Sequence, residues 1–111
     1  MGKMSREKGK RGERWIANYL KDKGYDAHRS AQFCGKTGDA ADVVGLPHIH
    51  IEAKWCERVQ IRVWYEQAVR DCEAAGHGDI PVVVHKVNRD IPLVTMSLED
   101  FMKIYEKGYK Q

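Results

Sequence analysis

The sequence predicts a single α/β domain, residues 1–111, in which a small mixed β-sheet is flanked by α-helices. Its 42% hydrophobic and 32% charged residues are ordinary for one globular domain. Along the chain, short β-branched runs alternate with longer segments whose apolar residues recur at helical spacing. No apolar run approaches the ~20 residues that a membrane helix needs. We therefore expect a soluble domain with no membrane partner.

The first predicted helix runs from about residue 10 to residue 24, where a glycine favours its end. Ile16 and Leu20, four residues apart, mark the face that packs inward. Residues 1–9 contain two glycines and no apolar pattern, so we expect a mobile basic arm there. Six lysines and arginines stand against two glutamates in the first fourteen residues. Such a cluster suits contact with phosphates, and a solvated terminus is the alternative.

The next part of the chain predicts three strands. Residues 25–30 form the first, and a loop at 31–41 contains two glycines and no clear period. A loop of this length in a small domain is usually functional or mobile. Residues 42–45 and 48–54 are strand-like runs separated by a Leu-Pro turn. The short turn predicts an antiparallel hairpin.

The second half predicts a helix, two strands and a final helix. The helix at 61–75 is followed by a glycine. Its apolar stripe consists of Trp64, Ala68 and Cys72. The β-branched run at 80–85 predicts a buried central strand, and residues 93–96 predict a further one. Ser97 begins a capping pattern for the last helix. The whole order predicts a mixed sheet with helices packed on it.

The predicted hairpin carries the candidate catalytic residues. Side chains alternate along a strand, so Glu52 and Lys54 share one face, and the hairpin brings Asp42 near Glu52. Burying these charges is costly unless they share a partner, and a divalent metal is such a partner. The backbone carbonyl of Ala53 is a candidate third ligand. Glu13, on the inward helix face, either completes the metal shell or is a first-turn residue favoured by the helix dipole.

Phosphodiester hydrolysis suits this set of residues. It requires an in-line water, neutralised phosphate charge and help for the leaving oxygen, which carboxylate-bound Mg²⁺ supplies. Lys54 is a candidate to orient or deprotonate the water, or to stabilise the pentavalent phosphate. His50 shares the strand face of Glu52, with a structural histidine as the alternative. Gln67, on the following helix, either reaches the site or packs on the helix surface.

Glu13, Asp42 and Glu52-Ala-Lys54 match the pattern of the PD-(D/E)xK nucleases. The segments at 8–16 and 24–30 resemble the archaeal Holliday junction resolvases and their phage relatives. The residue before the first motif aspartate is Ala41, where the nominal pattern has proline, but that position bears no ligand.

This resemblance implies a restriction-endonuclease-like core and a symmetric homodimer acting on four-way DNA. It also implies that Glu13, Asp42 and Glu52 bind Mg²⁺ or Mn²⁺, that Lys54 assists catalysis, and that Arg29 and Ser30 lie where DNA binds. Together with the basic residues of the arm, first helix and loop, the expected DNA-contacting set is Lys8, Lys10, Arg11, Arg14, Arg29, Ser30 and Lys36.

We therefore expect a Mg²⁺-dependent, structure-selective DNA endonuclease that resembles a Holliday junction resolvase and serves recombination and repair. The alternatives are another PD-(D/E)xK activity, such as a flap, nicking or restriction-like nuclease, and a nucleic-acid-binding module that does not cut. The basic N-terminus lacks the apolar stretch of a signal peptide, and the cysteines lack disulfide or zinc spacing. The expected location is the cytoplasm of a bacterial, archaeal or phage-infected cell.

Overall fold

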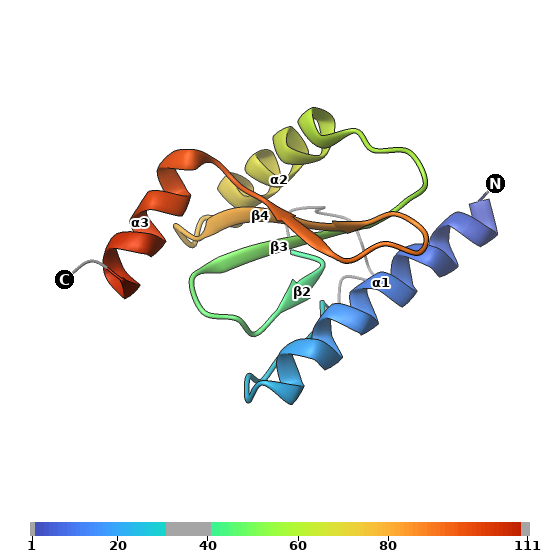
Figure 1. Ribbon diagram of the computed structural model, residues 1–111, viewed down its shortest axis with the longest axis horizontal. Coiled ribbons are helices and arrows are strands. Elements are labelled where there is room, and N and C mark those ends of the chain that lie inside the picture. Colours follow the sequence, from blue (N-terminus) through green and yellow to red (C-terminus); the bar gives the residue numbers. More distant parts are fainter. Residues whose placement is uncertain (1, 31–40, 110–111) are drawn as a thin grey trace.

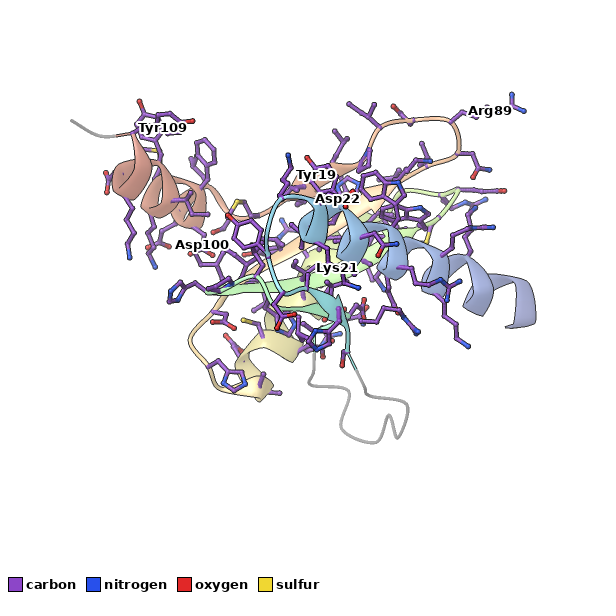
Figure 2. All side chains as sticks on the ribbon, turned by 90° about the horizontal axis from the view of Figure 1, so that it is seen from below. Tyr19, Lys21, Asp22, Arg89, Asp100 and Tyr109 are labelled. Atoms are coloured by element: carbon purple, nitrogen blue, oxygen red, sulfur yellow. The ribbon has the colours of Figure 1, made fainter. Side chains whose placement is uncertain are left out.

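A computed structural model describes residues 2–30 and 41–109 and has the predicted layers (Figure 1). Helix α1 (Gly2–Asp22) covers one face of a five-stranded sheet, and helix α2 (Ile61–Ala75) covers the other. Helix α3 (Leu98–Gly108) lies beyond one end of the sheet and buries none of its residues. Figure 2 shows Tyr109, just after α3, and Arg89, in the turn before the last strand, at opposite ends of the molecule. Among the described helices, none has the length and apolar character to cross a membrane.

The sheet has the strand order β1-β2-β3-β4-β5. Its central pair, β3 and β4, is parallel, and α2 is the crossover that connects them. The other neighbouring strands pair antiparallel. The sheet is therefore mixed, as predicted, with its two longest strands at its centre. The strands are β1 (His28–Arg29), β2 (Val43–Val44), β3 (Ile49–Trp55), β4 (Ile80–Lys86) and β5 (Leu93–Thr95).

The alternation of side chains along β3 divides the interior into two parts. Ile51 and Ala53 point toward α1 and belong to the main apolar core. His50, Glu52 and Lys54 occupy the other face, under α2. Trp64, Ala68 and Val83 form a smaller apolar cluster on that side. The main core consists of Ile16, Ala17, Ala27, Val43, Ile51, Ala53 and Val82.

Local signals in the sequence set several boundaries correctly. α2 begins and ends where predicted, and Gly76 closes it in the left-handed conformation with φ +73°. α1 ends in a Schellman motif, in which Gly24 has φ +102° and the Tyr25 N–H donates to the Leu20 carbonyl at 3.1 Å. Ser97 caps α3 by accepting a hydrogen bond from the backbone N–H three residues later.

The predicted start of the first helix is wrong. α1 begins at Gly2 rather than near Lys10, so residues 2–9, predicted as an arm outside the helix, form its first turns. Lysine, arginine, methionine and glutamate are good helix formers, and one glycine costs only about 1 kcal/mol in a helix interior. Gly9 therefore does not stop the helix. The strand predicted at 25–30 is also shorter, at His28–Arg29.

Gly12 fixes how closely α1 approaches the sheet. It is buried, and a Cβ atom added there would lie 2.6 Å from the Trp55 side chain. No real Cβ contact is that short, so only glycine allows α1 to lie this close to the end of β3. This contact also sets the height of the next residue, Glu13, above the sheet.

Candidate active site

Asp42 lies where the hydrogen-bond ladder between β2 and β3 ends. Its backbone N–H donates to the Ile51 carbonyl at 2.8 Å, and its carbonyl accepts from the Ser30 N–H at 3.0 Å. The Ala53 N–H on β3 then donates to Asp42 Oδ2, at 2.9 Å, instead of to a backbone carbonyl. The side chain thus takes the place of the next ladder acceptor, which fixes the carboxyl group beside Glu52.

Glu52 is almost completely buried beneath α2, with 2% of its surface exposed. Its Oε2 lies 3.0 Å from Nε2 of His50, two residues earlier on the same strand face. The same carboxyl group is within hydrogen-bonding reach of Asp42, just before β2, and of Asp71 from α2. Three carboxyl groups therefore converge at this point of the sheet.

The proximity of these carboxyl groups changes their acidity. Burial is the main cause that raises the pKa of Asp42 to about 7, and the negative charge of Glu52 adds to this rise. Burial and the charge of Asp71 raise the pKa of Glu52 to about 7. The Lys54 ammonium opposes both shifts. Two carboxyl groups that resist ionising together form a site in which a cation is electrostatically favoured.

Lys54 is held by a hydrogen bond to helix α2. Its Nζ donates to Oε1 of Gln67, on α2, at 3.1 Å. Gln67 was predicted as an accessory residue, and the structure places it against the predicted catalytic lysine. Asp71 was missed as a site residue. The sequence contains a signal for its role, because Asp71 follows Gln67 by four residues and adjoins the stripe formed by Trp64, Ala68 and Cys72. Gln67 and Asp71 therefore share an inward-facing side of α2.

Glu13 approaches from α1, on the other side of the sheet edge. Its Oε1 accepts a hydrogen bond from Nε of Arg29 at 2.9 Å, and 19% of its side chain is exposed. Burial raises the pKa of Glu13, Arg29 opposes this rise, and the charge of Asp42 adds to it. The structure thus places Glu13 beside Asp42 and ties it to Arg29, a residue predicted to contact DNA.

The other predicted DNA-contacting residues are spread over α1 and the segment after β1. Lys10, Arg11 and Arg14 are exposed on α1. Lys8 Nζ lies 3.9 Å from Oε2 of Glu57, in the segment after β3. Ser30 is partly buried and donates its N–H to Asp42. Lys36 and most of the predicted loop lie outside the described residues.

The donor atoms fit a hard divalent cation. Carboxylate oxygens are the ligands that Mg²⁺ and Mn²⁺ prefer, and the raised pKa values of Asp42 and Glu52 reflect a site where burial and neighbouring carboxyl groups disfavour negative charge. Over residues 2–30 and 41–109, no group of three or more His, Cys, Asp or Glu side chains is arranged to hold a metal ion. Mg²⁺ commonly uses one or two protein carboxylates and keeps several waters, so the pair is enough.

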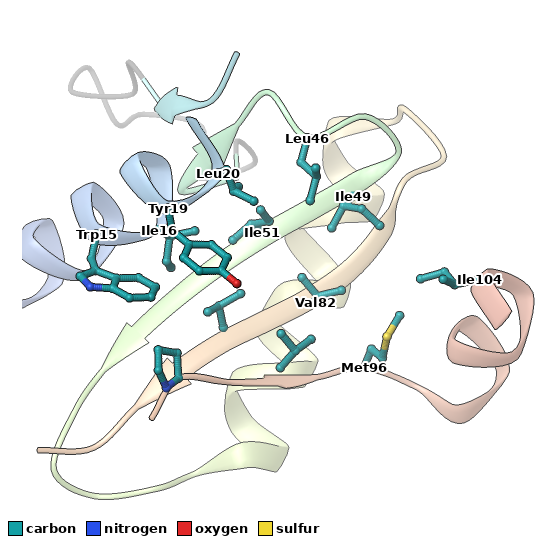
Figure 3. Close-up of a pocket in the computed structure, with 13 residues that line it drawn as sticks. Trp15, Ile16, Tyr19, Leu20, Leu46, Ile49, Ile51, Val82, Met96 and Ile104 are labelled. Atoms are coloured by element: carbon teal, nitrogen blue, oxygen red, sulfur yellow. The ribbon is translucent and has the colours of Figure 1, made fainter. Parts of the chain in front are cut away.

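The sheet also has an apolar hollow of about 400 Å³, on the face opposite the carboxyl groups (Figure 3). It lies between α1, the sheet and α3, and none of the carboxyl groups discussed above lines it. We therefore do not place the reaction there. Its lining residues include Trp15, Tyr19, Ile49, Val82, Met96 and Ile104.

Comparison with known proteins gives a match to a family model and matches to solved structures. The family described as "Phage putative PDDEXK endonuclease" matches residues 4–111. The chain is also similar to the solved structure of Hjc, a Holliday junction resolvase from the archaeal hyperthermophile Archaeoglobus fulgidus. The TM-score is 0.59 at 26% sequence identity, and the match covers 80% of this chain and 72% of that one. Among curated proteins, no significant match is found.

Proposed function

The chain belongs to the phage PDDEXK endonuclease family, and from that premise we propose that it is a Mg²⁺- or Mn²⁺-dependent endonuclease that cuts four-way DNA. Its core is restriction-endonuclease-like, as in Hjc, and it is a PD-(D/E)xK nuclease. The observation that carries the proposal is the pairing of Asp42 and Glu52 at the end of the β2–β3 ladder, with Lys54 beside them.

Each residue has a proposed role. Asp42, Glu52 and the carbonyl of Ala53 bind the cation, which supplies charge neutralisation at the phosphate and a more acidic water. Lys54, held by Gln67 at 3.1 Å, points its ammonium group at the attacked phosphate or the attacking water. Glu13 acts through a water next to Asp42, because Arg29 already engages its carboxylate.

The choice of four-way DNA has two supports. The first is the similarity to Hjc, which is described as a Holliday junction resolvase. The second is the row of basic side chains, Lys10, Arg11 and Arg14, exposed on the helix that also carries Glu13. Basic side chains next to a cutting site hold the phosphate backbone without reading sequence, which suits recognition of DNA shape.

A homodimer is part of the proposal, because two symmetric cuts across a junction require two sites. The unburied α3 supports it. Phe101, Ile104 and Tyr105 are 50%, 42% and 46% exposed, although they are large apolar side chains. A contiguous apolar surface of this kind is typical of an interface, and the proposed occupant is a second copy of the chain. We propose that the dimer acts in the cytoplasm.

A cleavage assay tests the proposal. Labelled four-way, flap, single-stranded and linear duplex DNA are incubated with the protein, in Mg²⁺ and in EDTA. Asp42→Asn and Glu52→Gln are run in parallel, and sedimentation reports the oligomeric state. We expect Mg²⁺-dependent cleavage of the four-way substrate by a dimer, and cleavage lowered by on the order of 10³-fold in either variant.

Other results select among the alternatives. Cleavage at close to the native rate in EDTA or in either variant would exclude the metal site. Preferred cutting of flap or linear DNA would replace the junction as substrate. Tight binding without cleavage in several divalent metals would identify a non-cutting module.

A further inference from the structure

We propose that His50 is a positioning residue that orients Glu52 for metal binding by hydrogen bonding to one of its two carboxylate oxygens. This inference rests on the metal-dependent function proposed above. The carboxylate that binds a metal needs a fixed direction, and such ligands are commonly held by a hydrogen bond from a neighbouring group.

The contact between the two side chains follows from the strand. His50 and Glu52 are two residues apart on β3, so their side chains leave the same face side by side. Nε2 of His50 lies 3.0 Å from Oε2 of Glu52, and the two side chains are 4% and 3% exposed. An ionised carboxylate has about four acceptor positions on its two oxygens. The bond from His50 occupies one of these positions, on Oε2, and so orients the group without using all of its acceptor positions.

The chemistry of the donor also fits this role. An imidazole keeps one N–H donor when it is uncharged, and the burial of this side chain, which is 4% exposed, disfavours its charged form. When Glu52 is ionised, the proton of that ring lies on Nε2. A neutral donor orients the carboxylate without placing a positive charge next to a bound cation.

Glu13 provides the contrast within the same molecule. It is held by the charged guanidinium of Arg29, at 2.9 Å. The positively charged guanidinium competes with a metal ion for the Glu13 carboxylate. An uncharged imidazole beside Glu52 does not compete in this way. The two partners therefore distinguish Glu52, proposed as a direct ligand, from Glu13, proposed to act through water.

Three variants and Mn²⁺ binding by calorimetry, on the full chain without DNA, test the role of His50. His50→Leu removes the donor and keeps similar volume, while His50→Gln keeps an amide N–H near the position of Nε2. His85→Leu is the matched control, because His85 is also a buried histidine facing α2, but it bonds to Thr95 Oγ1 at 2.8 Å. Thermal unfolding in EDTA is recorded for each protein.

We expect His50→Leu to weaken Mn²⁺ binding by on the order of tenfold, the usual effect of losing such a partner. His50→Gln should recover most of that loss, and His85→Leu should bind Mn²⁺ like the native protein while losing stability. Native affinity in His50→Leu, or an equal loss in His85→Leu, would overturn the inference.

If His50→Leu does not fold, His50→Asn replaces it, because its shorter amide cannot reach Glu52. Weaker Mn²⁺ binding by His50→Asn than by His50→Gln supports the role, and equal binding overturns it. A native protein that binds no Mn²⁺ would instead refute the proposed function, which separates the two failures.

Discussion

The two faces of the sheet are built from the same strand but have different chemistry. On the α1 face, Ile51 and Ala53 of β3 pack into an apolar core. On the α2 face, His50, Glu52 and Lys54 of the same strand lie in a polar layer that includes Gln67 and Asp71. The first face supplies stability by burying apolar surface. The second gives up stability, because it buries carboxyl groups whose pKa values are raised.

This comparison teaches how substitutions in the protein should be interpreted. A change on the α1 face should alter stability and leave the activity of the folded protein intact. A change in the polar layer of the α2 face should alter activity and leave stability unchanged or higher. Four measurements test this division between the two faces.

The largest effect is expected for Glu52→Gln. Loss of this proposed metal ligand should remove several kcal/mol of transition-state stabilisation, which at 1.4 kcal/mol per tenfold lowers cleavage by on the order of 10³-fold. In EDTA the unfolding temperature should stay the same or rise, because the amide cannot carry the buried charge. Cleavage of four-way DNA and thermal unfolding measure the two effects, and a large fall in stability would break the division.

Lys54→Ala is expected to lower the cleavage rate by about 10²-fold, the lower part of the range for loss of a group that acts in the transition state. Junction affinity should change little, since the lysine is proposed to act at the reacting phosphate. Single-turnover cleavage and equilibrium binding separate the two quantities. Equal losses in both would make Lys54 a DNA-binding residue.

Ile51→Ala tests the opposite face. Ile51 is 2% exposed, so the cavity left by its truncation should lower the free energy of unfolding by about 2 kcal/mol or more. Denaturant unfolding measures this loss. Cleavage per folded molecule, assayed well below the unfolding temperature, should be close to native. A loss of activity comparable to that of Lys54→Ala would show that the two faces are coupled.

The smallest effect is a pH dependence of stability without metal. Asp42 and Glu52 have folded pKa values of about 7, above their usual values of 3.8 and 4.5. Between about pH 4 and pH 7 these two carboxyl groups therefore bind more protons in the folded than in the unfolded state, so their contribution to stability falls as pH rises through this window, opposed by His50 and His85, whose pKa values burial lowers. The unfolding temperature in EDTA should be lower at pH 8 than at pH 5. Glu52→Gln should weaken this dependence, and Mg²⁺ should oppose it at pH 8.

Much of this architecture follows from local signals in the sequence. The stripe of α2, the caps at Gly24 and Ser97 and the hairpin before Glu52 are all contained within short segments, and each is present in the structure. The family and the restriction-endonuclease-like fold were also identified from the sequence motif, and the comparisons confirm them.

What the sequence did not predict depends on contacts between distant segments. Asp71 becomes part of the site only because α2 crosses over the middle of β3, and helical periodicity alone does not reveal that crossing. The pairing of Glu13 with Arg29 joins residues sixteen positions apart in different elements. The start of α1 was not predicted for another reason, since residues 1–9 contain two glycines and no apolar pattern to indicate a helix. The catalytic roles themselves stay predictions until the assays are done.

The bond from Ala53 N–H to Asp42 Oδ2 bears on how an intact DNA complex is best captured. Alanine at position 42 would leave that N–H without its acceptor and loosen the sheet edge, so an inactive protein would also be a distorted one. Asparagine keeps a carbonyl oxygen in the same place while removing the charge. Asp42→Asn is therefore the inactive form to use for crystallising or imaging an uncut junction on an undisturbed surface.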